Sequence, residues 1–388
     1  MNRARIYMDW NATAPVLDAA RAACLYALDL TGNPSSVHKE GRAIRALIEN
    51  SRRDVAALVG AAPASVIFTS GATEAANLVL TPDFRMGRTP LGVSHLYVSA
   101  VEHPALRDGG RFGADRVTKI PVLTSGVVDL AALETILGAH DKASGLAMVA
   151  IMVANNETGI VQPVALAAEI VRRHGGILVA DAVQAAGRMP LSIEDLGADF
   201  LILSSHKLGG PKGAGALIAR GEVMMPAPLL RGGGQEKGHR SGTENVMAIA
   251  GFAAAARAAA VNLPDRMDRI TGLRDQLEAR MRDAAADVII HGDAVERLGN
   301  TTFFTLPGLK PETGQIAFDL DGVALSAGAA CSSGKLGQSH VLTAMGFDPE
   351  QGGLRISIGV STTQDDIERC AEVFAKVAGR RKAASVAA

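Results

Sequence analysis

A reactive lysine is the first candidate for chemistry that the sequence offers. In the stretch FLILSSHKLGGPKGAGAL, residues 200–217, an apolar run leads directly into two serines, a histidine, Lys207 and a glycine-rich turn. A lysine amine is a nucleophile only when it is neutral, and burial or Schiff-base formation makes it reactive. Ser204, Ser205 and His206 add hydrogen-bond donors that suit an anion. The stretch therefore predicts a lysine for an aldehyde beside an anion site.

Two further segments complete this chemistry. Asp181 ends the apolar run ILVAD, and TSGATEAANL, residues 69–78, has the pattern of a helix start with Gly71 and Thr73. Free N–H groups at a helix N-terminus bind phosphate. A lysine, phosphate donors and a carboxylate for a ring nitrogen are what pyridoxal 5'-phosphate (PLP) requires. The alternative for residues 69–78 is an ordinary helix start with Ser70 as its N-cap.

The elements that must position these residues alternate along the chain. Apolar runs at residues 65–71, 95–106, 146–159, 177–187 and 199–210 are separated by segments with helical spacing. This alternation predicts an α/β fold whose large domain has a mostly parallel sheet with helices on both faces. The runs end in polar residues, and the ligand crevice of an open α/β sheet lies at the carboxyl ends of its strands.

The pattern of apolar and helical segments changes after about Thr243. Two long helical segments follow, and then short apolar runs and a closing helix, which together predict a smaller α+β domain. We expect residues 15–260 to form the large PLP-binding domain. Residues 1–14 and 261–388 are expected to form the small domain, because chain ends often lie close together.

The composition favours a protein that acts on a small molecule. The 39 basic and 40 acidic side chains are mixed along the chain and give a net charge of −1, so no basic stripe favours nucleic acid. Cys24, Cys331 and Cys370 have spacings that suit neither a disulfide framework nor a zinc site, which favours a reducing compartment. The longest apolar runs are too short to span a membrane, and the first residues do not have the pattern of a signal peptide. We expect a cytoplasmic protein.

Nearly the whole chain resembles a known family. It is similar to the cysteine desulfurases of the NifS/IscS-like group, which are aminotransferase-type, fold type I PLP enzymes. The resemblance rests on these segments, in chain order: YMDWNATAP, GNPSSVHKEGR, FTSGATEAAN, EHPA, NNETGIVQP, DAVQAAG, SSHKLGGPKGAG, GGGQEKGHRSGTEN, SAGAACSSG and LRISIG. The turn after Lys207 departs from the pattern, because Gly209 stands where a bulkier residue is common, and this predicts a looser turn.

The resemblance implies a set of cofactor-binding residues. Lys207 would bind the cofactor aldehyde and later move the substrate's Cα proton. Asp181 would pair with the ring nitrogen, and the ring of His103 would stack on the cofactor and assist proton transfer. The remaining cofactor residues implied by the family are Asn155 near the ring, Gln184 at the ring hydroxyl, Ala72, Thr73, Ser204 and His206 at the phosphate, and Thr243 at the phosphate of the neighbouring subunit of a homodimer.

The resemblance also implies how the substrate is handled. Arg355, helped by Asn33 and Asn155, would bind the carboxylate of L-cysteine. The Cys331 thiolate would take the sulfur as a persulfide and leave L-alanine. Cys331 lies in SAGAACSSGKLGQS, which is small and polar on both sides of the cysteine and predicts a loop that carries the thiol to the substrate. By contrast, Cys24 and Cys370 lie in apolar helical stretches and are expected to be ordinary packed side chains.

The implied acceptor is a protein such as an iron–sulfur scaffold, for cluster assembly or for thio-modification of a cofactor or tRNA. No resident metal is required, although Cys331 could transiently ligate an iron–sulfur cluster. Three alternatives stay open. Two share the fold, a selenocysteine lyase and an aminotransferase. The third is a non-enzymatic nucleotide-binding module, prompted by the glycines of GGPKGAG and RGGGQEKG, although neither segment matches the phosphate-loop pattern.

Overall fold

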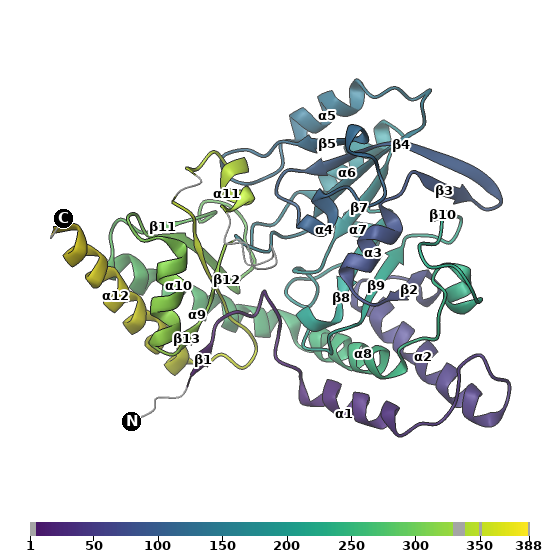
Figure 1. Ribbon diagram of the computed structural model, residues 1–388, viewed down its shortest axis with the longest axis horizontal. Helices are drawn as coiled ribbons and strands as arrows, with labels where there is room; N and C mark the ends of the chain where they lie inside the picture. Colours follow the sequence, from purple (N-terminus) through teal and green to yellow (C-terminus); the bar gives the residue numbers. More distant parts are fainter. Residues whose placement is uncertain (1–4, 329–337, 349–350, 387–388) are drawn as a thin grey trace.

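The computed structural model describes residues 5–328, 338–348 and 351–386, with side chains to residue 381. Its larger part is built on one sheet with the strand order β10-β3-β4-β6-β7-β8-β9-β2, and β5 pairs with β4 (Figure 1). The strands are β2 (Val66–Thr69), β3 (Asp83–Met86), β4 (Thr89–Ser99), β5 (Val117–Ile120), β6 (Leu146–Met152), β7 (Ile177–Asp181), β8 (Phe200–Ser204), β9 (Gly215–Ala219) and β10 (Met224–Pro226).

The centre of this sheet is parallel, as the sequence predicts. Strands β5, β4, β6, β7 and β8 pair in parallel, whereas β9 lies antiparallel between β8 and β2. The sequence pattern does not predict β9, because its residues follow a glycine-rich turn that reads as a loop. Two successive antiparallel pairings make β2 parallel to β8. Thr69 and Ser204, the last residues of those strands, consequently share the register partner Gly215.

Helices cover both faces of the sheet because its strands are apolar on both sides. In β8, Leu201 and Leu203 belong to one hydrophobic cluster, and Phe200 and Ile202 belong to another. The first cluster packs against α2 (Lys39–Leu58), α5 (Leu130–Gly138), α6 (Val164–Arg173), α7 (Ile193–Leu196) and α8 (Val246–Ala260). The second packs against α3 (Ala72–Val79) and α4 (Pro104–Arg107), and α1 (Asp18–Leu28) lies on α8 through buried alanines.

A second, smaller sheet has the order β11-β12-β15-β14, and a separate pair joins β1 to β13. Figure 1 shows these strands and the last helices at the end of the molecule where both chain termini lie. The elements are β1 (Ile6–Tyr7), α9 (Leu263–Ala284), β11 (Ile289–Ile290), β12 (Thr301–Thr305), α10 (Pro311–Leu320), β13 (Val323–Ala324), β14 (Ser326–Ala327), α11 (His340–Ala344), β15 (Leu354–Ser357) and α12 (Gln364–Val386).

This smaller part has a hydrophobic cluster of its own. Met8, Leu277, Phe304, Phe318 and Phe374 are buried together, away from the clusters that flank the large sheet. The division into residues 15–260 and residues 1–14 with 261–388 stays a prediction. This separate cluster supports it, and a further cluster joins Val101 and Ile160 of the larger part to Phe303 and Leu342 of the smaller one. No single helix in the part of the chain that the structure describes is both long and apolar enough to cross a bilayer. Only α8 and α9 taken together, bent by 79° at their junction, reach that length and composition.

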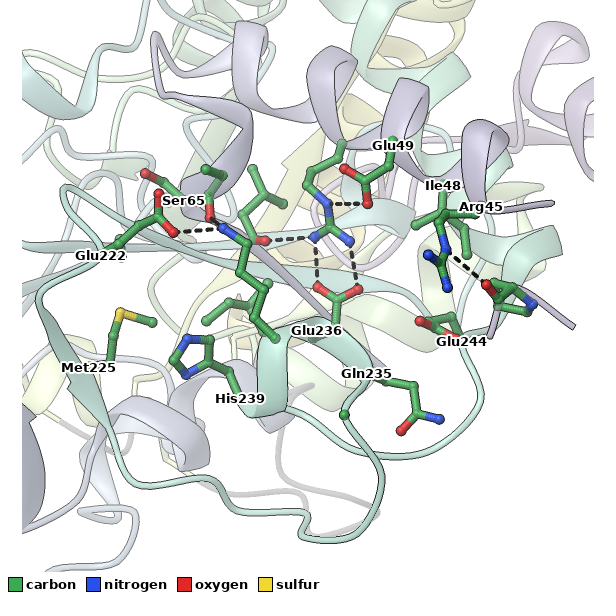
Figure 2. A pocket seen from close by; sticks show the side chains of 18 of the residues that line it. Arg45, Ile48, Glu49, Ser65, Glu222, Met225, Gln235, Glu236, His239 and Glu244 are labelled. Atoms are coloured by element: carbon green, nitrogen blue, oxygen red, sulfur yellow. Dashed lines mark hydrogen bonds and ion pairs between the residues drawn. The ribbon is translucent and has the colours of Figure 1, made fainter. Parts of the chain in front are cut away.

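A buried ion pair fastens the segment that follows β10 to the large sheet. Arg52 of α2 donates to both carboxylate oxygens of Glu236, at 2.7 and 2.8 Å, and the Phe68 amide donates to Glu236 at 2.9 Å. Arg52 and Glu236 line a cavity of about 540 Å³, and Figure 2 shows Glu236 among the lining side chains. Glu236 has the left-handed φ of +46°, which is unfavourable for a residue with a Cβ. Its side-chain bonds therefore offset part of the cost of this backbone conformation.

We predict that Glu236→Gln strongly destabilises the protein. Removing the Glu236 charge leaves the buried Arg52 guanidinium with only the half-exposed Glu49, at 3.3 Å, as a charged partner, at a cost of about 3 kcal/mol. Glu368→Gln is the matched control, because Glu368 pairs with Arg280 at 3.6 Å where both side chains are about half exposed. An exposed pair contributes about 1 kcal/mol or less. Thermal denaturation should show a large drop in midpoint for the first variant only, and equal drops would contradict the assignment.

Candidate active site

One cavity of about 630 Å³ lies where β6, β7 and β8 end. We call it the lysine pocket. Parallel strands bring their carboxyl ends to one edge of the sheet, so residues distant in sequence meet there. Of the residues predicted from the sequence, those that line this pocket are Ala72, Thr73, His103, Asp181, Gln184, Ser204, His206 and Lys207.

Asp181 is a buried carboxylate at the end of β7. It is 7% exposed and accepts one backbone hydrogen bond, from the Val183 amide at 2.9 Å. Burial raises its pKa to about 6, although that hydrogen bond and the nearby Lys207 act in the opposite direction. Burial and then Asp181 itself raise the pKa of Glu102 well above its usual range. Glu102 is not part of the pocket lining, so Asp181 is the carboxylate that faces the cavity at the end of β7.

The two histidines of the pocket are neutral at physiological pH. Burial and then Lys207 lower the pKa of both His103 and His206 to about 4. His103 Nδ1 accepts a hydrogen bond from the Ala105 amide at 3.1 Å, which places the ring proton on Nε2. His206 Nδ1 lies 3.2 Å from the Thr13 hydroxyl.

Lys207 is held by main-chain oxygens of residues 9–14, a segment that we call the strap. Its amine donates to the carbonyls of Asn11 and of Ala12, the latter at 2.9 Å. Gln184 Nε2 donates to the same Asn11 carbonyl at 3.1 Å. The Asn11 side chain is buried among polar groups of both parts of the molecule, and its partners are Asn156 O, Thr301 Oγ1 and Asn300 Nδ2.

The turn after Lys207 is tight, so the expectation of a looser turn is wrong. Gly209 has φ of +85°, a left-handed conformation that favours glycine. The Leu17 amide donates to its carbonyl at 2.9 Å, and a Cβ at this position would come within 2.7 Å of the Leu17 side chain. Glycine is favoured here because of this φ and because the chain packs closely against Pro15 and Leu17, which follow the strap.

The anion end of the pocket is the first turn of α3. The N-cap residue is Gly71, which makes no side-chain capping bond, so Ser70 does not have the N-cap role of the alternative interpretation. Instead the Ser70 amide donates to Glu74 Oε2 at 2.8 Å. A Cβ at Gly71 would meet no atom within 4 Å, so open space adjoins the backbone of this helix start. Ser204 and His206 line the same pocket.

Arg355 does not line the lysine pocket. Its side chain is 2% exposed, and its guanidinium donates to Asp9 Oδ1 at 2.7 Å and to the Asn156 carbonyl at 2.9 Å. Arg355 Nε is buried and has no hydrogen-bond partner among the described residues. A buried donor of this kind is costly unless a ligand pairs with it.

Three other predicted residues also lie outside the pocket lining, and a fourth lies outside the described residues. Asn155 is buried at the end of β6, where its side chain bonds to Val101 O and to the amides of Glu157 and Thr158. Asn33 and Thr243 are exposed. Cys331 belongs to residues 329–337, which the structure does not describe.

The structure adds residues that the sequence reasoning missed. Glu74, Asn156 and Lys212 line the lysine pocket together with Ala12 and Thr13 of the strap. Lys212 lies in the glycine-rich turn after Lys207, and Glu74 directly follows Thr73. Their places beside predicted site residues could have indicated both of them. No residue type in the strap indicates its role, because the strap binds Lys207 through main-chain carbonyls.

The other cysteines differ in burial. Cys370 is fully buried, and burial raises the pKa of its thiol to about 12, as expected of a packed side chain. Cys24 is half-buried, and burial raises its thiol pKa as well. Neither has the lowered pKa of a reactive thiol. Across residues 5–328, 338–348 and 351–386, no group of three or more His, Cys, Asp or Glu side chains is placed to hold a metal ion.

Comparison with known proteins agrees with this geometry. The model of the aminotransferase class-V family matches residues 6–370. A cysteine desulfurase of Nostoc sp. is 37% identical, with 98% of this chain and 94% of the relative covered. An IscS-like cysteine desulfurase of Mycobacterium tuberculosis is 35% identical, with 98% of both chains covered.

A solved structure gives the same result in three dimensions. The NifS-like protein of Rickettsia africae superposes with a TM-score of 0.86 at 35% identity, over 96% of this chain and 99% of that one. The match spans both sheets and the strap between them, which agrees with the α/β fold predicted from the sequence. The chain therefore belongs to the aminotransferase class-V family, in its NifS/IscS-like group of cysteine desulfurases.

Proposed function

We propose that this protein is a PLP-dependent cysteine desulfurase, which removes sulfur from L-cysteine and releases L-alanine. The observation that carries the proposal is the meeting of Lys207, Asp181 and the first turn of α3 in one pocket. This is the donor set that PLP needs, with a lysine for the aldehyde, a carboxylate for the ring nitrogen and a helix N-terminus for the phosphate. Relatives named cysteine desulfurase match nearly the full length of the chain and support the substrate.

The residues present fit PLP on two structural observations. The open space beside the Gly71 backbone leaves room for an anion, next to Ala72, Thr73, Ser204 and His206. Asp181 is a buried charge with one backbone hydrogen bond, so a cationic ring nitrogen would satisfy it. Bound PLP would supply an electron sink for the charge that develops at the substrate Cα.

The residues of the chain have distinct tasks in this proposal. Asp181 holds the proton on the ring nitrogen, and Lys207 takes the proton from the substrate Cα and returns a proton to the product. Neutral His103 lines the pocket and would donate from Nε2 to a bound ligand, since its Nδ1 already accepts from Ala105. Gln184 lines the pocket after β7 and would orient the bound ring, whereas Asn155, outside the lining, would act by holding the turn after β6.

The sulfur step is assigned to Cys331 from the sequence. Its thiolate attacks the substrate sulfur, an S–S bond forms, and the substrate C–S bond breaks. The electron pair of that bond stays with the carbon skeleton, which is protonated and leaves as alanine. Arg355 is the proposed anchor for the substrate carboxylate, with Asn33, and the unpartnered Nε–H of Arg355 supports this role. The persulfide then passes to an acceptor protein such as an iron–sulfur scaffold, in the cytoplasm.

We also propose a homodimer in which Thr243 reaches the phosphate of the neighbouring subunit. Thr243 is exposed in the single chain and lines no part of the lysine pocket. Leu25, Tyr26 and Leu28 of α1 expose 53%, 61% and 60% of their surface. A gathering of large apolar side chains on a surface is typical of an interface with another chain.

The first prediction separates the roles of the lysine and the cysteine. Purified protein with L-cysteine and a thiol reductant should yield sulfide and alanine in equal amounts. Lys207→Ala should lose both the absorbance band of bound PLP and activity. Cys331→Ser should keep the band and yield neither product, because only the sulfur acceptor is missing. Full activity of Cys331→Ser would contradict the proposal and favour a lyase or an aminotransferase.

The second prediction concerns Asp181 in protein freed of PLP. Its raised pKa means that the folded state binds the proton more tightly than the unfolded state. The associated stability is complete below about pH 4 and is lost as pH rises through about 6. Asp181→Asn should therefore be more stable than wild type at pH 8, by on the order of 1–3 kcal/mol, and similar to it near pH 4. With PLP bound, turnover of the variant should fall by about a hundredfold or more, since the ring nitrogen loses its charged partner.

Thermal denaturation at the two pH values measures this stability change. Asp268→Asn is the control, because Asp268 is an exposed carboxylate on α9. If Asp181→Asn has the same pH dependence of stability as wild type, Asp181 does not titrate as described.

The third prediction tests the dimer. Leu28→Asp should convert the protein from dimer to monomer in sedimentation experiments, because it places a charge in the exposed apolar patch. Leu320→Asp is the matched control, since Leu320 is a leucine with 82% exposure on α10. A wild-type monomer, or a Leu28→Asp variant that stays dimeric, would contradict the proposed interface.

A further inference from the structure

An acidic side chain lines the anion end of the lysine pocket. Glu74 lies in the first turn of α3, directly after Ala72 and Thr73, and its side chain is 12% exposed. Its Oε2 accepts the Ser70 amide at 2.8 Å. A carboxylate is favourable at an empty helix N-terminus, but it opposes the binding of a second anion at the same place. A phosphate bound here would therefore face a neighbouring negative charge.

Arg240 supplies the compensating charge. Its Nε donates to Glu74 Oε1 at 2.9 Å and its Nη2 donates to Oε2 at 3.4 Å, with a side-chain exposure of 20%. Burial acts to raise the pKa of Glu74, but the hydrogen bonds from Arg240 and Ser70 outweigh it and lower the pKa. Glu74 is thus ionised, and Arg240 pairs with both of its oxygens.

Arg240 also belongs to the segment that carries Thr243, residues 231–245. This segment is held by the Arg52–Glu236 pair at one point and by the Arg240–Glu74 pair at another. Inside it, the Ser241 hydroxyl donates to Gly233 O at 2.7 Å. Thr243 follows Arg240 by three residues, so the pair with Glu74 connects the anion end of the pocket to the segment offered to a second copy of the chain.

We propose that Glu74 and Arg240 form a charge-neutralising positioning pair for the phosphate of the cofactor. Glu74 holds the Ser70 amide and fixes the start of α3, and Arg240 cancels the charge that Glu74 would otherwise turn toward the phosphate. This inference rests on the proposed function, because it assumes that the anion is the phosphate of PLP. Neither residue touches the reacting atoms.

Replacing Arg240 and replacing Glu74 should have different effects on the affinity for the phosphate. Arg240→Met leaves an ionised, uncompensated Glu74 beside the anion, so affinity falls. Glu74→Gln removes the negative charge but keeps an oxygen that can accept the Ser70 amide, so affinity is retained. In the double variant no charge opposes the phosphate, and affinity returns. A pair that served only to hold the segment would show no such rescue.

The experiment is equilibrium binding of PLP to PLP-free full-length protein, followed by the absorbance of bound cofactor. Pyridoxal, which lacks the phosphate, is the parallel probe. We expect Arg240→Met to weaken PLP binding about tenfold or more, with pyridoxal binding unchanged. Glu74→Gln and the double variant should stay within about threefold of wild type for both probes. Arg280→Met is the matched control, because Arg280 forms an exposed ion pair.

Three results would overturn the inference. They are unchanged PLP affinity in Arg240→Met, an equal loss of PLP and pyridoxal affinity, or a double variant as weak as Arg240→Met. Each of these is distinct from a failure of the proposed function. In that failure, wild-type protein would bind no PLP, or Lys207→Ala would bind it as wild type does.

Discussion

The buried side chain of Asn11 is the contact on which the arrangement of the pocket depends. Its amide group bonds to Thr301 and Asn300 of the smaller part and to the Asn156 carbonyl of the larger part. The main-chain carbonyl of Asn11 accepts hydrogen bonds from the Lys207 amine and from Gln184 Nε2. Lys207 is thereby located relative to both sheets through one residue. A shift of one sheet against the other would be transmitted to Lys207 without any change in the lysine's own strand.

Burial then decides the charges inside the pocket. The same desolvation that raises the pKa of Asp181 lowers the pKa of His103 and His206. The result is a pocket in which the histidines are neutral and polarisable while Asp181 is ionised. A cationic ring nitrogen next to Asp181 and an anion next to α3 would complement this pattern, so the protein has arranged its charges before any ligand is bound.

Much of this arrangement could be predicted from the sequence, because strand ends of a parallel sheet must meet. That rule is enough to bring Asp181 and Ser204 to one edge, and the helix start at residues 71–73 follows from its own pattern. The antiparallel strand β9 was missed, since a glycine-rich turn hides it. Side-chain pairs such as Glu74 with Arg240 join segments 166 residues apart, and no local pattern reports them. Asn33 and Thr243 are exposed and lie outside the lysine pocket, so their sequence motifs alone do not place them at the site.

The hydrogen bonds from Lys207 to the strap have a consequence for which substitutions the strap can tolerate. Its acceptors are the main-chain oxygens of Asn11 and Ala12, and every amino acid supplies the same oxygen. A substitution at position 12 therefore keeps the acceptor, provided that the backbone keeps its path and that the new side chain leaves the lysine pocket open, since Ala12 lines it. Asn11 is different, because its side chain fixes that path. The strap thus has two adjacent positions with different requirements. Residue 12 contributes through its main chain, whereas residue 11 contributes through its side chain as well.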